Sequence, residues 1–167
     1  LNSDILNIGA SGQGWVRIED GGRVTAERSD LGFQSYEIGM VEVLGAGSTW
    51  DVNSQLRIGV DGYGGMSIED GGRVTSAVAG VGTASTGAGS VSVVGADSVW
   101  SNTGIMTLGG QEAGPGTGTA SLGIFDGGLV ESGNVVVWGG AELRGNATLR
   151  TGMLTMWGTV RPGNSIG

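Results

Sequence analysis

Five carboxylates stand at positions where acid–base chemistry would be sought first. Glu19 and Asp20 precede a Gly-Gly pair, Glu69 and Asp70 precede another, and Asp126 precedes a third. A retaining glycosidase needs two carboxyl groups about 5 Å apart, an inverting one needs about 6.5–9.5 Å, and the two groups need unlike environments. Turns stacked above one another could meet the distance. They fail on environment, because the same local sequence surrounds each turn, so we expect no catalysis from these residues.

Other reaction chemistries lack their usual residues. The chain has no Cys and no His, which excludes thiol catalysis and Cys-ligated metal centres and removes the commonest general base and metal ligand. No clustered DxD pattern occurs, and no GGxGxD series recurs every nine residues as a calcium-binding repeat requires. We therefore predict a protein that is not an enzyme and holds neither a metal nor a cofactor.

Composition and charge exclude several classes of partner. Of 167 residues, 37 are Gly, yet 38% are hydrophobic and Gly does not recur at every third position, which argues against collagen and against disorder. All eight basic residues are Arg, and the net charge of -8 would repel nucleic acid and anionic lipid. No run approaches the roughly 20 apolar residues of a membrane span. The N-terminal residues also lack the basic and apolar regions of a signal peptide. We expect neither nucleic-acid binding nor membrane insertion of this segment.

A fifty-residue repeat organises the chain. Residues 6–25 match residues 56–75 at thirteen of twenty positions, and VEVLGAGSTW at 41–50 returns as VSVVGADSVW at 91–100. A third copy opens at Met106, carries six extra residues within 110–119, and rejoins the pattern at 122–130. Such spacing is typical of a solenoid, in which each unit buries its apolar face against the next. We divide one segment, 1–167, into repeats 6–55, 56–105 and a divergent 106–157, followed by residues 158–167.

The sequence of each repeat is typical of β-strands. Apolar residues alternate with polar ones in the second unit, for example at Leu56 and Ile58 and at Met66 and Ile68, and Asp-Gly or Gly-rich turns separate these stretches. No helical periodicity survives between the turns. The pattern predicts an all-β parallel β-helix with about two coils of roughly 20–25 residues in each repeat.

The alternation also predicts which side chains face inward. Equivalent residues of successive coils should stack in ladders, with Ile18 above Ile68 and Val43 above Val93 and one coil between each pair. Trp50 and Trp100 recur at one position, where we expect core filling, with ligand binding as the alternative. The predicted core residues are Ile18, Trp50, Ile58, Ile68, Val93, Trp100 and Ile124.

Four aromatic residues are candidate partner contacts. Trp15 is out of phase with inward Val16, and Trp138 follows three consecutive valines, so both are predicted to point outward, against a sugar or protein or beneath a loop. Residues 26–39 share little sequence with 76–89, and they contain Phe33 and Tyr36. Binding residues of solenoids usually lie on such variable stretches.

The C-terminal sequence resembles a known family. GTVRPGNSIG at 158–167 is similar to a segment near the C-terminal end of the passenger in Gram-negative autotransporters, the type V secretion proteins, and the upstream VxGAGSxW and LxIGxxGxGxxxIxDGGxV units resemble passenger repeats. The resemblance implies a right-handed β-helix that acts as stalk and autochaperone of a secreted adhesin or virulence factor. It also implies partners in the protein's own outer-membrane β-barrel and upstream passenger rungs, and location at the bacterial cell surface or outside the cell.

Two other functions stay open. The segment itself could be an adhesive surface for a host protein, a glycan or sister cells, as in virulence factors that recruit the host actin machinery. It could also be a carbohydrate-active β-helix of the lyase or tailspike type.

Overall fold

The computed structural model describes residues 1–111 and 114–163. Within them the backbone forms strands and turns only, and none of the described residues belongs to a helix. A membrane-spanning helix is accordingly not found among them. The last four residues of the GTVRPGNSIG stretch, 164–167, lie outside the described residues.

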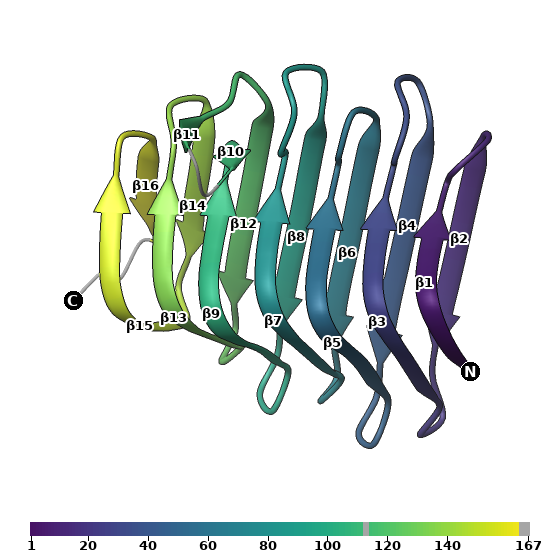
Figure 1. The fold of residues 1–167 in the computed structure, drawn as a ribbon. Coiled ribbons are helices and arrows are strands. Elements are labelled where there is room, and N and C mark those ends of the chain that lie inside the picture. The colour runs from purple at the N-terminus through teal and green to yellow at the C-terminus, as the bar shows by residue number, and fades with distance from the viewer. Residues whose placement is uncertain (112–113, 164–167) are drawn as a thin grey trace.

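Two seven-stranded parallel sheets form the body of the molecule, one in front of the other (Figure 1). The front sheet contains, in spatial order, β1 (Asn2–Ile8), β3 (Arg23–Leu31), β5 (Thr49–Ile58), β7 (Arg73–Val81), β9 (Val99–Leu108), β13 (Leu129–Val137) and β15 (Thr148–Met156). The rear sheet contains β2 (Gln13–Ile18), β4 (Ile38–Leu44), β6 (Tyr63–Glu69), β8 (Ala88–Val94), β12 (Thr119–Phe125), β14 (Ala141–Gly145) and β16 (Thr159–Pro162). We number the seven rungs from the N-terminus, so that β1 and β2 form rung one and β15 and β16 form rung seven.

The chain winds as a right-handed parallel β-helix. In Figure 1 it rises along a front strand, crosses at the top to the rear sheet, descends, and returns to the front one rung further from the N-terminus. Parallel strands joined by such crossovers nearly always have this hand, because the strands themselves twist right-handedly. The all-β, right-handed parallel β-helix predicted from the sequence is confirmed.

Strand register confirms two coils in each fifty-residue repeat. Trp50 of the first repeat pairs with Val74, and Val74 in turn pairs with Trp100 of the second repeat, so one coil separates the two tryptophans. On the rear sheet the ladder runs from Ile18 through Val43 and Ile68 to Val93. The two predicted ladders are therefore one column, in which residues of the two series alternate.

The third repeat changes the rung length twice. Val93 pairs with Ile68 on one side and with Ile124 on the other, and the path along the chain to Ile124 is the longer of the two. This longer path includes the short antiparallel pair of β10 (Gly110–Gln111) and β11 (Gly114–Pro115). Rungs six and seven are shorter than the earlier ones, as the pairing of Ile124 with Gly145 and of Val130 with Leu149 shows.

The core lies between the two sheets and runs along the helix axis. The structure buries all seven residues expected there, and Trp50 and Trp100 have no exposed surface. Each fully buried Val, Ile or Leu contributes about 1.5–3 kcal/mol to the free energy of unfolding. A few such residues in every rung offset much of the entropy lost when the backbone becomes ordered.

Candidate functional site

The repeated carboxylates occupy identical turns. Asp20, Asp70 and Asp126 have φ of 55°, 52° and 53°, and the glycine after each also has positive φ, as the two central residues of a type I′ turn do. The amide of Gly22 closes the first of these turns by donating to the carbonyl of Glu19 at 2.9 Å. Asp tolerates the left-handed conformation better than most residues. The repeated Asp-Gly sequence is thus explained by turn geometry.

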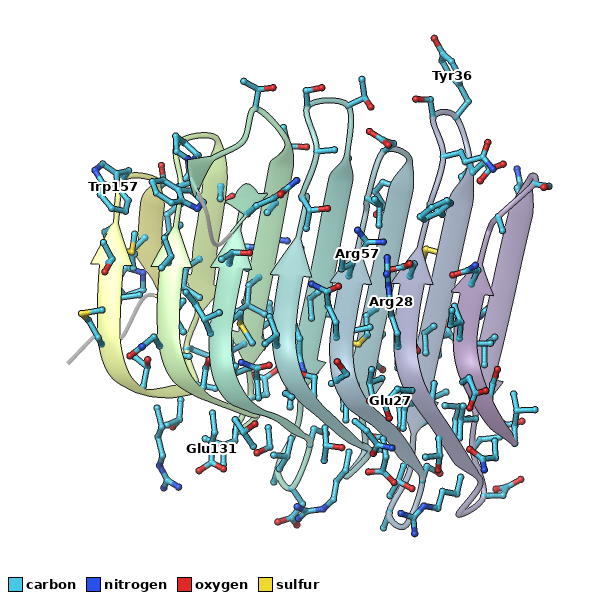
Figure 2. The ribbon with its side chains drawn as sticks, viewed as in Figure 1. Glu27, Arg28, Tyr36, Arg57, Glu131 and Trp157 are labelled. Carbon is cyan, nitrogen blue, oxygen red and sulfur yellow. The ribbon has the colours of Figure 1, made fainter. Side chains whose placement is uncertain are left out.

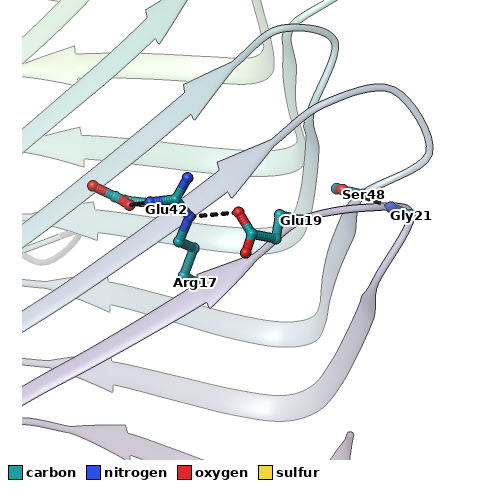
Figure 3. A network of polar contacts seen from close by, with 5 residues as sticks. All are labelled: Arg17, Glu19, Gly21, Glu42 and Ser48. Atoms are coloured by element: carbon teal, nitrogen blue, oxygen red, sulfur yellow. Dashed lines mark hydrogen bonds and ion pairs between the residues drawn. The ribbon is translucent and has the colours of Figure 1, made fainter.

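The surroundings of Glu19 are an exposed ion-pair network (Figure 3). Arg17 Nε lies 2.7 Å from Glu19 Oε2, and Arg17 Nη1 lies 3.7 Å from Glu42 Oε2 on the neighbouring rung. The adjoining turn is held by Ser48, whose hydroxyl accepts a hydrogen bond from the amide of Gly21 at 3.2 Å. Exposed ion pairs of this kind contribute about 0.2–1 kcal/mol each. The network helps to align rungs one and two.

A buried ion cluster lies on the front sheet, where Figure 2 shows Arg28 and Arg57 close together. Asp30 is only 2% exposed and accepts two hydrogen bonds from Arg57, at 2.6 and 2.8 Å. Arg28 Nη2 lies 2.9 Å from the same carboxylate. Burial raises the pKa of Asp30 above its ordinary value, and the Arg28 guanidinium lowers it in part. Arg57 also lies over the ring of Phe33, at 5.9 Å from its centroid.

A hollow of about 220 Å³ adjoins this cluster. It lies where Gly80 separates Arg57 from Thr107 in one column of the front sheet. The Arg57 guanidinium is engaged by Asp30, and Thr107 donates its hydroxyl hydrogen bond to the carbonyl of Gly110 at 3.0 Å. The Arg57 guanidinium and the Thr107 hydroxyl beside this hollow are therefore paired within the protein.

Trp15 and Tyr36 are exposed near the N-terminal end. Trp15 lies in β2, is 68% exposed, and neighbours Met40 of the next rung. Tyr36 is fully exposed at the tip of the loop before β4 and projects away from the solenoid (Figure 2). Its φ of 67° is left-handed, a conformation that is unusual for an aromatic residue.

A second hollow, of about 400 Å³, lies beside Tyr36. It spans the loops that precede β4, β6 and β8, and it is lined by Tyr36, Tyr63, Glu37, Asp61 and Thr86, among others. Two tyrosines and two carboxylate residues therefore line one surface hollow. We define these five residues as the tyrosine hollow.

Trp138 is half-buried at the opposite end of the solenoid. Its ring stacks on that of Trp157, with the centroids 4.5 Å apart and the planes 10° from parallel. Its indole Nε1 donates to the carbonyl of Gln111 at 3.2 Å, so the strand pair β10–β11 covers it from the other side. Trp157, which is 60% exposed, presents the outer indole face of this stack.

The tryptophan stack replaces a column of glycines. At the end of the front strand, rungs one to five carry a glycine with positive φ, and backbone hydrogen bonds place Trp138 and Trp157 in the same column. These glycines are Gly9, Gly32, Gly59, Gly82 and Gly109. A Cβ added at Gly32, for example, would collide with the carbonyl of Tyr63. The chain turns the corner differently in rungs six and seven, which leaves room for the indoles.

The four candidate aromatic residues do not form one site. Phe33 packs under Arg57, Tyr36 joins the tyrosine hollow, and Trp15 and Trp138 lie in rungs one and six. Sequence reasoning missed Tyr63 and Trp157. Tyr63 stands at the slot that Gln13 occupies one repeat earlier, and Trp157 follows the final inward residue of its strand as Trp138 does. The change from Gln13 to Tyr63, and the recurrence of Trp after a front strand, could have indicated these two residues from the sequence.

No group of three or more acidic side chains within residues 1–111 and 114–163 is arranged to hold a metal ion. Comparisons of this chain with protein-family models, with curated proteins and with solved structures give no match.

Proposed function

We propose that this chain is a non-catalytic segment of an autotransporter passenger, in which it serves as stalk and autochaperone. Its partners would be the upstream rungs of the same passenger and the outer-membrane barrel that exports it. Its location would be the bacterial surface or the medium. The resemblance of the repeats and of GTVRPGNSIG to autotransporter passengers motivates this proposal, and the departure of rungs six and seven from the rest of the solenoid supports it.

The tryptophan stack is the observation that carries the folding role. A stacked aromatic pair contributes about 0.5–1.5 kcal/mol beyond the surface that it buries. Shortening a rung by about a quarter lowers its loop-closure cost by only about 0.2 kcal/mol. The contact between Trp138 and Trp157 is thus the larger of the two effects. It joins the last two rungs into a unit on which preceding rungs could assemble as they emerge from the barrel.

The placement of the carboxylates supports a non-catalytic role. Each repeated Asp serves the same turn, and Glu19 is engaged by Arg17. A carbohydrate-active enzyme would need two carboxyl groups in unlike environments on either side of a bond. The exposed Trp15 and Tyr36 favour a different second candidate, in which the segment itself binds a host protein, a glycan or sister cells.

Surface export tests the folding role. The chain is fused ahead of a type V outer-membrane barrel, and the displayed protein is measured by adding protease to intact cells. We expect the double variant Trp138→Gly/Trp157→Gly to lower display severalfold, because the C-terminal unit loses its stack.

The repeat supplies a matched control. Deleting residues 56–105 removes one whole repeat and rejoins equivalent positions, so the shortened solenoid keeps its C-terminal rungs. We expect this deletion to leave display close to that of the parent. Full display of the double variant, or equal loss from both changes, would contradict the autochaperone role.

A further inference from the structure

The tyrosine hollow has the size and position of a ligand site. Its volume of about 400 Å³ falls within the range of about 300–1,000 Å³ that is usual for small-molecule sites. Three successive rungs contribute to it, with Tyr36, Tyr63 and Thr86 coming from rungs two, three and four at or just before the start of a rear strand. A ligand held there would lie along the solenoid axis and contact each of these rungs.

Tyr36 is strained without a packing benefit. The loop closes through a hydrogen bond from the amide of Glu37 to the carbonyl of Gln34 at 3.2 Å, and Tyr36 stands at the third position of this turn, with φ of 67°. Gly or Asn is the usual residue for a left-handed third position. Among the described residues, every other non-glycine with positive φ is an Asp. Strain of this kind persists where a residue serves a purpose other than stability.

The equivalent turn in the next repeat shows which residue features the turn itself requires. There the amide of Gly87 donates to the carbonyl of Ala84 at 3.0 Å, and Thr86 takes the place of Tyr36 without a positive φ. The fold thus accommodates this turn without an aromatic ring and without a left-handed residue. Because folding does not require the fully exposed ring of Tyr36, we attribute it to binding.

The charges around the hollow select the kind of ligand. Glu37 accepts a hydrogen bond from the amide of Gln34, and Asp61 accepts one from the hydroxyl of Thr86. A carboxylate has about four acceptor positions, so both can accept further hydrogen bonds. None of the residues that line the hollow is basic. The site therefore disfavours an anion, and its free acceptor positions suit a molecule with many hydroxyl donors.

We propose that the tyrosine hollow binds a neutral glycan. The rings of Tyr36 and Tyr63 would stack on the apolar C–H face of a sugar residue, and the carboxylates of Glu37 and Asp61 would accept hydrogen bonds from its hydroxyl groups. The site gives the second candidate function its ligand class and its residues. It does not depend on the folding role of the C-terminal rungs.

A glycan array containing neutral, sialylated and sulfated oligosaccharides tests this assignment with the full chain. The expected result is binding to neutral members of the array only. Tyr36→Phe, which keeps the ring, should bind like the parent, and Tyr36→Gly should bind about tenfold more weakly. Tyr36→Gly should also raise the denaturant midpoint, because glycine adopts positive φ without strain.

The opposite signs of these two effects separate binding from stability. Weaker binding from a more stable variant cannot come from loss of the fold. Absence of neutral glycan binding, preference for anionic glycans, or unchanged binding by Tyr36→Gly would overturn the proposal.

Binding to cultured epithelial cells distinguishes a glycan ligand from a protein ligand. Removal of surface glycans with glycosidases should abolish Tyr36-dependent binding. If only protease treatment abolished it, the hollow would bind protein and the glycan assignment would be wrong. A failure of either assay leaves the export experiment unaffected, so the two proposals fail separately.

Discussion

The first repeat, 6–55, and the second, 56–105, share a core shape and differ in what surrounds it. Trp50 and Trp100 are equally buried at the same slot. Trp100 donates its indole hydrogen bond to Ser76 at 3.1 Å, whereas Trp50 Nε1 has no partner among the described residues. The repeat therefore preserves apolar shape more strictly than hydrogen bonding.

One buried column explains the difference. In the first repeat it contains Ala26 and Val52, and in the second it contains Ser76 and Asn102. Ser76 donates to Asn102 Oδ1 at 2.9 Å, and Asn102 Nδ2 donates to Ser132 Oγ at 3.0 Å. The column is therefore apolar near the N-terminus and carries a hydrogen-bonded polar network through rungs four to six.

On the outer face of the front sheet it is the first repeat that carries the more polar residues. Asp30 and Arg57 form a buried ion pair in rungs two and three, while the residues fifty positions later are Gly80 and Thr107. The first repeat has an ionic cluster at the place where the second has a hollow. Four sets of substitutions test what the two repeats share and where they differ.

The largest effect is expected where the repeats are the same. Ile68 lies between Val43 and Val93 in the rear-sheet column and is fully buried. Ile68→Asp would bury a carboxylate without a partner and should cost several kcal/mol, enough to unfold neighbouring rungs. In the isolated segment Ile18→Asp should cost less, because β2 pairs there with a strand on one side only. Circular-dichroism melts measure both, and an unchanged melt for Ile68→Asp would contradict the stacked core.

The next effect concerns the ion pair. Arg57→Thr installs the residue of the second repeat and leaves Asp30 with Arg28 as its remaining ionic partner. It should cost about 2 kcal/mol, because the two charge-assisted hydrogen bonds from Arg57 are lost. The double variant Asp30→Gly/Arg57→Thr should recover most of that loss, because it also removes the buried carboxylate that has lost two of its hydrogen bonds. Urea denaturation provides the free energies. Equal losses in the single and the double variant would show that the Asp30 carboxylate carries no penalty once Arg57 is removed.

A comparable or smaller loss is expected from Ser76→Ala. It leaves the indole N–H of Trp100 and the amide oxygen of Asn102 each without their present partner, and should lower the free energy of unfolding by about 1–3 kcal/mol. Chemical denaturation followed by tryptophan fluorescence measures it. A loss below about 0.5 kcal/mol would mean that the network is dispensable.

The smallest effect is a gain. Ala26→Ser places an acceptor at the slot from which Ser76 serves Trp100, and should add up to about 1 kcal/mol by satisfying Trp50. Val52 offers the new hydroxyl no acceptor of the kind that Asn102 gives Ser76, which keeps the expected gain small. Destabilisation by Ala26→Ser would show that the first repeat cannot accept the polar column.

The fold could be predicted from the sequence because both the fifty-residue repeat and the two-residue alternation are typical of a parallel β-helix. The alternation at Ile58 and Ile68 indicates which faces turn inward, and fifty-residue spacing aligns the rungs. The sequence did not predict the tyrosine hollow, because Tyr36, Tyr63 and Thr86 lie on three different rungs, and Tyr36 and Tyr63 each replace a different residue at the equivalent position of the neighbouring repeat. The stack of Trp138 and Trp157 was also beyond it, since the change of rung length at the C-terminus sets that register.

Pulsed hydrogen exchange during refolding from urea tests the proposed folding order most directly. A C-terminal nucleus predicts that amides of β13 and β15 gain protection before those of β3 and β5, and that Trp138→Gly/Trp157→Gly abolishes this lead. Protection that arises first in β3 and β5, or in all four strands at once, would contradict such a nucleus.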